Sequence, residues 1–234
     1  MKIGLIGAMD EEVKLLKESM ANAKTDEMAS YQFTTGIFGG MDVTLLQSGI
    51  GKVNAAVGTT LLNHIYQPDY VINTGSAGGF HSELNVGDII ISTSVCYHDV
   101  DVTAFGYEYG QVPDMPVLFE ADQRLIQLAE TCAKQLTHQQ VVKGKIASGD
   151  SFMNDSKRIE SIRSKIKDLY AVEMEAAAIA HVCFRFKVPF VIIRSLSDIA
   201  GKDAPMSFDQ FLHVASENSA KLILRMLEEL DEHG

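Results

Sequence analysis

Short apolar segments alternate with amphipathic segments along most of this chain, which is typical of an α/β fold. Residues 2–8 form an apolar run with β-branched and glycine residues, and residues 10–20 follow directly with helical spacing. Two further apolar runs flank Gly39 and Gly40 and predict a β-hairpin, because glycine tolerates the positive φ of tight turns. Strands are predicted at residues 2–8, 31–37, 41–47, 70–73, 89–95, 141–148 and 188–195, and helices at 10–20, 53–66, 122–135, 155–167, 173–186 and from 208 onward.

The order of these elements predicts a mostly parallel sheet that helices cover on both faces, with one antiparallel hairpin. Residues 98–119 show no regular period and contain Pro113 and Pro116. A loop of this length is uncommon unless it acts as a lid or a contact surface. The chain has 234 residues, 46% of them hydrophobic, and shows no repeats or linkers, so we expect one domain over residues 1–234.

Composition and charge narrow the classes of partner. Acidic residues outnumber basic residues by 31 to 20, and a formal net charge of -11 disfavours nucleic acid and anionic membranes. No apolar run is long enough to span a bilayer, and Asp10 interrupts the first run before it resembles a signal peptide, so a cytoplasmic protein is expected. Three widely spaced cysteines fit neither a disulfide framework nor a zinc site, and the seven histidines lack ligand spacing, so no metal is expected.

Three short acidic stretches stand at junctions between predicted strands and helices, at residues 10–12, 172–175 and 194–198. Because ligands of open α/β sheets bind beyond the carboxyl ends of strands, Glu12, Ser76, Gly78 and Asp198 are the first candidates for a site. Each acidic stretch also has an ordinary explanation, since acids in a first helical turn complement the helix dipole and Asp198 or Ser197 could cap a helix. If the fold brings the stretches together, they supply a base, a hydroxyl-binding carboxylate and an acid. Such a set can break a glycosidic bond.

Two other features bear on the same site. Arg194 lies in a predicted buried strand, where an unpaired charge would be costly, so one of the acids is expected to pair with it. The glycine-rich stretch 75–79 would let a ligand approach the backbone and offers amide donors, although a turn without a ligand explains it equally well. This stretch matches neither the dinucleotide-binding motif nor the P-loop, and the chain lacks the Gly-x-Ser-x-Gly motif of many serine hydrolases.

Several motifs, in matching order, resemble those of the 5'-methylthioadenosine/S-adenosylhomocysteine nucleosidase family, within the nucleoside phosphorylase superfamily. They are GLIGAMDEE at residues 4–12, SGIGKVNAA at 48–56, NTGSAGG at 73–79, HDVDVTAFGY at 98–107, SGDSF at 148–152, VEMEA at 172–176 and SLSD at 195–198. The resemblance covers essentially the whole chain. It implies a three-layer α/β sandwich, with a mixed, partly barrel-like central sheet flanked by helices, and a homodimer.

The resemblance also implies an activity. The family hydrolyses the N-glycosidic bond of 5'-methylthioadenosine and S-adenosylhomocysteine, which releases adenine and methylthioribose or S-ribosylhomocysteine and serves methionine salvage. The partner is then a small nucleoside, and neither a metal nor an organic cofactor is expected. Asp198 would be the general acid that protonates adenine at N7, which needs a raised pKa, and Glu12 would be the general base that activates water.

The resemblance assigns the remaining contacts as well. Glu175 would accept hydrogen bonds from the ribose hydroxyls, Arg194 would orient the acids, and Ser76 would help to hold the water. Phe152 would stack on adenine, and the backbone of Met153 would bind the edge of the base, at a position where the family usually has Ile or Val. The substrate-binding residues implied are Met9, Ile50, Ser76, Gly78, Phe152, Met153, Glu173, Met174, Glu175, Arg194, Ser197 and Phe208, with Val102, Phe105, Tyr107 and Pro113 from the partner subunit.

Three other functions stay open from the sequence. A nucleoside phosphorylase of the same superfamily would need cationic groups around phosphate, and only Lys52 and Arg194 are near the motifs. A nucleoside-binding protein could keep the pocket without the chemistry, although it would have little use for all three acids. The same site could also hydrolyse a related nucleoside such as an aminofutalosine.

Overall fold

One mixed sheet of eleven strands forms the centre of the structure, within the part of the chain that the computed structural model describes, residues 1–136, 139–201 and 204–233. The strands are β1 (Lys2–Gly7), β2 (Ala21–Met28), β3 (Tyr31–Phe38), β4 (Met41–Gln47), β5 (Tyr70–Asn73), β6 (Ser76–Gly79), β7 (Ile89–Tyr97), β8 (Phe119–Glu120), β9 (Val141–Ser148), β10 (Leu169–Glu173) and β11 (Phe190–Ile199). The helices are α1 (Asp10–Glu18), α2 (Lys52–Leu61), α3 (Gln123–Leu136), α4 (Ser156–Lys165), α5 (Ala176–Phe186) and α6 (Ala204–His233), with a π-helical turn η1 (Leu62–Tyr66) and a 3₁₀ turn η2 (Thr103–Phe105).

Five of the strands close into a ring. The sheet order is β2-β3-β4-β1-β5-β11-β6-β10-β9-β7-β8, and β11 also pairs with β7, so β11, β6, β10, β9 and β7 form a closed, barrel-like unit. Parallel and antiparallel pairings both occur in it, because β6–β10 and β11–β7 are antiparallel while β9 pairs in parallel with β7 and β10. The mixed, partly barrel-like sheet implied by the family resemblance is confirmed. Among the described residues, six of the eleven strand pairings are parallel, and the predicted antiparallel hairpin is β3–β4. Four further pairings are antiparallel, which the element order could not indicate because it does not report strand direction.

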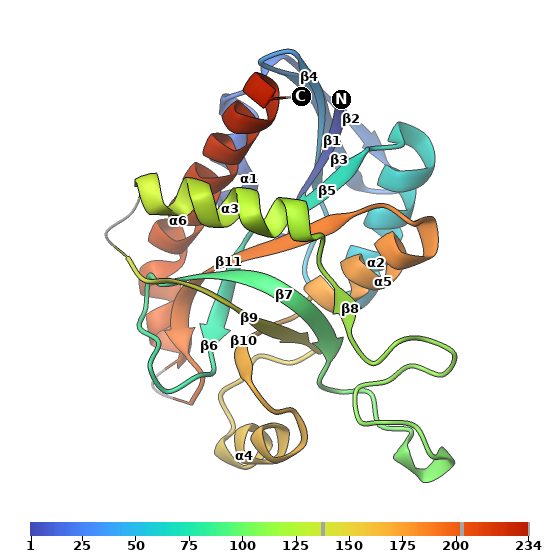
Figure 1. Ribbon diagram of the computed structural model, residues 1–234, viewed down its shortest axis with the longest axis vertical. Coiled ribbons are helices and arrows are strands. Elements are labelled where there is room, and N and C mark those ends of the chain that lie inside the picture. Colours follow the sequence, from blue (N-terminus) through green and yellow to red (C-terminus); the bar gives the residue numbers. More distant parts are fainter. Residues whose placement is uncertain (137–138, 202–203, 234) are drawn as a thin grey trace.

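Helices pack on both sides of the sheet and complete three layers (Figure 1). On one side α6 packs against α1 and α3, and on the other α2 packs against α5. The central strands carry the core: β11 is buried along nearly its whole length, and β1 is buried after its first residue. No helix in the described ranges is both long and apolar enough to cross a membrane.

Most predicted elements are present, but three assignments near the site are corrected. The glycine-rich stretch is a strand, β6, because its backbone pairs with both β11 and β10. Glu173 ends a strand, β10, where the sequence predicted the start of a helix. Asp198 lies within β11, which runs to Ile199, so it does not follow the strand as expected.

Two other segments complete the comparison with the predictions. Strand β2 was not predicted, because none of its residues is buried and it lacks the alternation that marks a half-buried strand. The segment between β7 and β8 contains only the short turn η2, as its lack of period indicated, and it protrudes from the body of the molecule at the lower right of Figure 1.

Candidate active site

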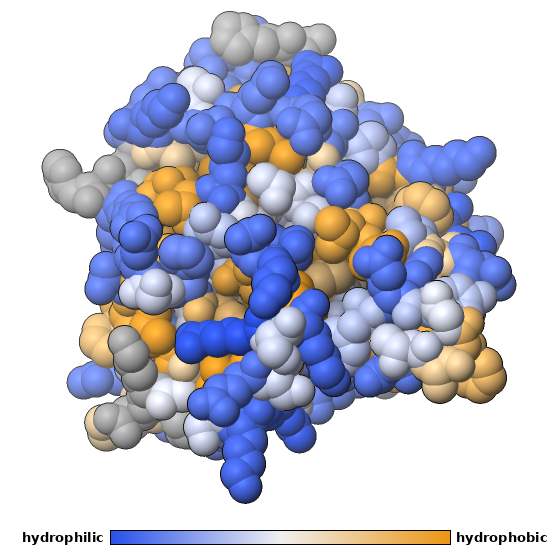
Figure 2. Space-filling model, turned by 60° about the horizontal axis from the view of Figure 1, so that its bottom comes forward, coloured by the Kyte–Doolittle hydropathy of each residue, from blue (hydrophilic) through white to orange (hydrophobic). Residues whose placement is uncertain are grey.

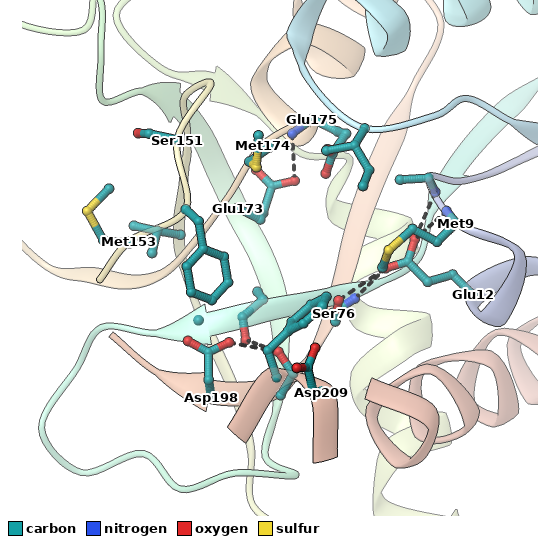
Figure 3. A pocket seen from close by; sticks show the side chains of 18 residues that line it. Met9, Glu12, Ser76, Ser151, Met153, Glu173, Met174, Glu175, Asp198 and Asp209 are labelled. Atoms are coloured by element: carbon teal, nitrogen blue, oxygen red, sulfur yellow. Dashed lines mark hydrogen bonds between the residues drawn. The ribbon is translucent and has the colours of Figure 1, made fainter. Parts of the chain in front are cut away.

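A cavity of about 340 Å³ opens where the start of α1, strand β6, the ends of β10 and β11, and the start of α6 converge (Figure 3). Its lining contains thirteen of the predicted site residues: Met9, Glu12, Ile50, Ser76, Gly78, Phe152, Met153, Glu173, Met174, Glu175, Ser197, Asp198 and Phe208. The fold therefore brings the three acidic stretches to one place. Arg194 does not line the cavity but lies behind it, 2% exposed.

Glu12 projects from the first turn of α1 and is held by donors from two directions. One carboxylate oxygen, Oε2, accepts the backbone N–H groups of Ala8 at 2.8 Å and Met9 at 3.2 Å. The other, Oε1, accepts the Ser76 N–H at 2.9 Å and the Ser76 hydroxyl at 3.2 Å. Glu12 is only 3% exposed, so these contacts fix it as an acceptor at the wall of the cavity.

A β-bulge places Asp198 and its neighbour on the same wall. The β11–β6 pairing shifts register between Leu196 and Asp198, so Ser197 is an extra residue in the strand. Successive side chains of a regular strand point to opposite faces, whereas here both Ser197 and Asp198 line the cavity. The Ser197 hydroxyl donates to Asp198 Oδ1 at 2.8 Å (Figure 3). Burial raises the pKa of Asp198, and the hydrogen bond from Ser197 offsets only part of that rise.

The backbone opposite Asp198 has no side chain, which leaves room for the carboxyl group. Gly78 pairs with Asp198 across the two strands, and a Cβ atom at this glycine would lie 3.0 Å from Asp198 Oδ2. Such a distance is tighter than an ordinary contact. Gly78 thus leaves room for the Asp198 carboxyl group, and it also lines the cavity, so the ligand contact expected from the sequence stays a prediction.

Glu173, in the wall of the cavity, and Arg194, behind that wall, form a buried ion pair. Glu173 Oε2 pairs with Arg194 Nη2 at 2.6 Å and accepts the N–H groups of Glu175 at 3.0 Å and Ala176 at 2.8 Å, so it caps the start of α5. Its other oxygen is hydrogen-bonded to the Ser148 hydroxyl. The prediction that a buried arginine pairs with one of the acids is confirmed, and the acid is Glu173. This network orients the β10–α5 junction that carries Met174 and Glu175.

Glu175 behaves differently from Glu173, two residues away. Its Oε1 accepts one backbone N–H, from Gly51 at 2.8 Å. Burial and the negative charge of Glu173 raise the pKa of Glu175 to about 8, against the opposing effects of Arg194 and of the Gly51 N–H. Glu175 is therefore a carboxyl group at the cavity wall whose pKa lies well above the ordinary value of 4.5.

Aromatic and apolar side chains form the rest of the lining. Phe152 and Phe208 meet edge to face, with ring centroids 5.8 Å apart, and Phe152 is 40% exposed at the mouth. Sequence reasoning missed five lining residues, each of which adjoins a predicted one: Ala8, Ala77, Ser151, Val172 and Asp209. Four of them lie within the family motifs, and Asp209, next to Phe208, is outside them.

The four residues expected from a partner subunit lie away from the cavity of their own chain. Val102, Phe105, Tyr107 and Pro113 all belong to the protruding segment between β7 and β8, and none lines the cavity. Phe105 is 81% exposed. In Figure 2, apolar side chains gather at the right-hand edge, where this segment reaches in Figure 1.

The charge of the lining is one-sided. Among the described residues that line the cavity, five carry carboxyl groups and none carries an ammonium, guanidinium or imidazole group. Lys52 and Arg194, the cations nearest the motifs, are paired with Asp99 and Glu173 respectively. Such a lining disfavours an anionic ligand and suits a neutral or cationic one.

Known proteins are similar to this chain over almost its whole length. The family model for the phosphorylase superfamily matches residues 2–228. The 5'-methylthioadenosine/S-adenosylhomocysteine nucleosidase of Bacillus subtilis is 59% identical over 230 residues, which cover 98% of this chain and 100% of that protein.

Solved structures agree as well. The nucleosidase of Colwellia psychrerythraea in complex with adenine has a TM-score of 0.96 and 50% identity, with 98% of this chain and 96% of that one covered. The Neisseria meningitidis nucleosidase in complex with methylthio-immucillin-A has a TM-score of 0.95 and 45% identity, with 97% and 99% covered. The chain belongs to the phosphorylase superfamily and, within it, to the family of 5'-methylthioadenosine/S-adenosylhomocysteine nucleosidases.

Proposed function

We propose that this protein hydrolyses the N-glycosidic bond of 5'-methylthioadenosine and S-adenosylhomocysteine, releasing adenine and methylthioribose or S-ribosylhomocysteine. One observation carries the proposal. A single cavity holds a buried carboxyl group with a raised pKa, Asp198, and a second carboxylate, Glu12, that protein donors hold as an acceptor. Release of methylthioribose places the reaction in methionine salvage.

The departing base needs a proton. As the C1'–N9 bond breaks, positive charge develops on the ribose and negative charge on the purine. Asp198 donates its proton to adenine N7, so that the base leaves as neutral adenine. The raised pKa of Asp198 lets the group hold this proton at higher pH than an exposed aspartate would.

Water completes the reaction at C1'. Glu12, together with the Ser76 hydroxyl, orients a water molecule and takes one of its protons as the oxygen bonds to C1'. The C1'–N9 bond breaks, the remaining hydroxyl stays on the sugar, and the proton on Glu12 returns through solvent to Asp198 for the next turnover.

The other lining residues hold the nucleoside in position. Glu175 accepts hydrogen bonds from the ribose 2' and 3' hydroxyls, and these contacts strengthen as the sugar becomes cationic, which favours the transition state. Phe152 stacks on adenine, and the Met153 backbone binds its edge. Met9, Ile50, Met174 and Phe208 line the channel for the alkylthio group, and the Glu173–Arg194 pair orients the junction that carries Met174.

The rival phosphorylase reaction fits the cavity less well. Phosphate would meet five carboxyl groups and no cation among the described lining residues. Adenine release from 5'-methylthioadenosine should therefore proceed at the same rate in phosphate-free buffer and in millimolar phosphate. A rate that depends on phosphate would contradict hydrolysis, and binding without adenine release would support a non-catalytic binding protein.

The experiment that tests the function is a comparison of substrates. Purified protein is incubated with 5'-methylthioadenosine, S-adenosylhomocysteine and an aminofutalosine, and adenine is quantified by chromatography. The proposal expects kcat/KM in the usual enzymatic range for the first two nucleosides, about 10⁴–10⁸ M⁻¹s⁻¹. Release from the aminofutalosine alone would assign the site to that substrate.

We also infer that a homodimer completes the site. The protruding segment and the 81% exposed Phe105 support the prediction that Val102, Phe105, Tyr107 and Pro113 contact the substrate in a partner subunit. A mixture of the inactive Asp198→Asn chain with a Phe105→Ala chain should regain activity, because one site of the mixed dimer has both wild-type residues. Sedimentation as a monomer, or no gain on mixing, would contradict the shared site. The cytoplasmic location stays a prediction.

A further inference from the structure

Three charged residues outside the cavity, Lys52, Asp99 and Asp150, form a network that connects two of its walls. We call this network the clamp. Asp99 Oδ2 accepts the Lys52 ammonium at 2.6 Å and the Asp150 N–H at 3.0 Å. Asp150 Oδ1 in turn accepts the backbone N–H of Lys52 at 2.8 Å, and its Oδ2 lies 3.8 Å from the Lys52 ammonium. None of these three residues lines the cavity. The network joins the turn before α2 to the end of β7 and to the loop after β9.

Two of the three joined segments, the turn before α2 and the loop after β9, carry a lining residue next to the clamp. Ile50 lies two residues before Lys52, and Phe152 lies two residues after Asp150. Between them, the turn before α2 is held in an unusual backbone conformation. Gly51 has a φ of 96°, which side chains rarely permit, and a Cβ atom there would lie 3.2 Å from Asp150 Oδ1. The turn therefore presses closely against Asp150.

The same turn makes the contact that connects the clamp to the proposed chemistry. The Gly51 N–H donates to Glu175 Oε1 at 2.8 Å, one residue before the clamped Lys52. The charges that face Glu175 come from Glu173 at the end of β10, Arg194 on β11 and Glu12 on α1. Of the groups that act on Glu175, Arg194 and the Gly51 N–H lower its pKa, whereas burial and the two acids raise it. A turn that moves away from Glu175 removes one of the two opposing effects.

We propose that Asp99 and Asp150, acting through Lys52, are positioning residues that hold the Gly51 N–H on Glu175 and fix Ile50 and Phe152 in the cavity walls. This inference deepens the proposed function, because it assumes that Glu175 binds the ribose. The clamp lies outside the cavity, where partly exposed ion pairs add little to stability, so its effect is on geometry. A displacement of about 1 Å in a site can lower turnover by about 100-fold.

The decisive variant is Asp99→Ala, because two explanations predict opposite results. Loss of a nearby negative charge by itself would lower the pKa of Glu175. Release of the turn would raise that pKa, because Glu175 would lose the Gly51 N–H. The measurement is a ¹³C NMR titration of the Glu175 carboxyl in the ligand-free protein, where the wild type is expected to titrate at about 8. The clamp predicts a higher pKa in Asp99→Ala and an intermediate one in Asp99→Asn, which keeps an acceptor oxygen.

A matched control removes the same kind of pair elsewhere. Glu130 pairs with Lys143 at 3.0 Å, and both side chains are partly exposed. Glu130→Ala should leave the Glu175 titration and the kinetics unchanged. Asp99→Ala should lower kcat/KM for 5'-methylthioadenosine by about tenfold, as a displacement of less than 1 Å would.

The outcomes separate this inference from the proposed function. A Glu175 pKa that falls or stays constant in folded Asp99→Ala would overturn the clamp, whatever the kinetics. Failure of the wild type to release adenine would overturn the proposed function. The Glu175 titration would still show whether the clamp holds the Gly51 N–H on Glu175. If Asp99→Ala does not fold, Lys52→Met at about 1 M salt replaces it, since the Debye length is then about 3 Å and the lost charge is screened. An unchanged titration in that variant would likewise refute the clamp.

Discussion

Glu12 and Asp198 face the same cavity from two parts of the fold, and their surroundings differ in almost every respect. Glu12 stands in a helical first turn and accepts hydrogen bonds from three backbone N–H groups and one hydroxyl. Asp198 lies in a bulged strand of the closed ring and accepts a single hydroxyl, from Ser197. One carboxyl group is thus held as an acceptor, whereas burial raises the pKa of the other, which then holds its proton to higher pH than an exposed aspartate would. The proposed mechanism accordingly assigns the base to the carboxylate that has more donors.

Replacement of Asp198 should have the largest effect on activity. Asp198→Asn cannot protonate the leaving base, and kcat should fall by about 10²–10⁴-fold. The measurement is adenine release at saturating 5'-methylthioadenosine, with adenine binding as the control for an intact cavity. A variant that keeps near-normal kcat would show that Asp198 is not the acid.

The same variant has a signature in stability. The pKa of Asp198 is raised above its unfolded value of 3.8, so the native state binds the proton more tightly than the unfolded state. The wild type therefore loses stability as pH rises from 3.8 through the raised pKa, and the neutral Asn does not. Denaturant unfolding should show the advantage of Asp198→Asn growing with pH and then levelling off.

Replacement of Glu12 tests the role of the carboxylate that accepts several hydrogen bonds. Glu12→Gln should also lower kcat by about 10²–10⁴-fold, because an amide cannot take a proton from water. Its NH₂ group must also face the N–H groups that Glu12 now accepts, which costs about 1–3 kcal/mol of folding free energy. Unfolding curves for the two variants side by side should show Glu12→Gln as the less stable. Equal stability would contradict the difference in donor number.

An intermediate effect is expected from the backbone beneath Asp198. Gly78→Ala would place a Cβ atom 3.0 Å from Asp198 Oδ2 and shift the carboxyl group by a few tenths of an ångström. The kcat should fall by about tenfold with a smaller change in KM, since the acid acts mainly in the transition state. Gly49→Ala is no suitable control, because Gly49 has a φ of 73°. Ala77→Ser, at the neighbouring position, shows whether any enlargement of β6 has the same effect.

The smallest effect should come from the hydroxyl that Asp198 accepts. The hydrogen bond from Ser197 lowers the pKa of Asp198, so Ser197→Ala should raise it further. The alkaline limb of the kcat profile then moves to higher pH, while the rate on the plateau changes little. A limb that moves to lower pH would show that Ser197 acts in another way.

The sequence was sufficient to identify most of the residues that line the cavity but not the local structures that shape it. Glu12, Glu175 and Asp198 each lie in a short continuous motif that can be recognised in the sequence, and all three line one cavity. The bulge at Ser197 was not predictable, because it depends on how β11 pairs with β6. Closure of the ring depends on the pairing of β11 with β7, which are about 100 residues apart in the chain. No local sequence pattern indicates that these two strands pair.

The two acids within residues 172–175 also show that sequence does not reveal contacts between distant strands. Two acids next to an alanine-rich helix indicate a helix start, and a helix does begin there. Sequence could not show that Glu173 is the strand residue that caps α5 and pairs with Arg194, since that partner lies 21 residues away in β11. Tertiary contacts assign different tasks to the two neighbouring acids.

Strand β2 has a consequence for behaviour at high concentration. It ends the sheet order and pairs with β3 alone in the described part of the chain, which leaves one row of backbone groups open to another molecule. Such an edge can template intermolecular β-pairing and aggregation. Lys24, Asp26 and Glu27 place charges of both signs along it, and all are exposed. Charges of this kind discourage a second copy from adding to the edge, so the strand protects the solubility of the folded protein through its polarity.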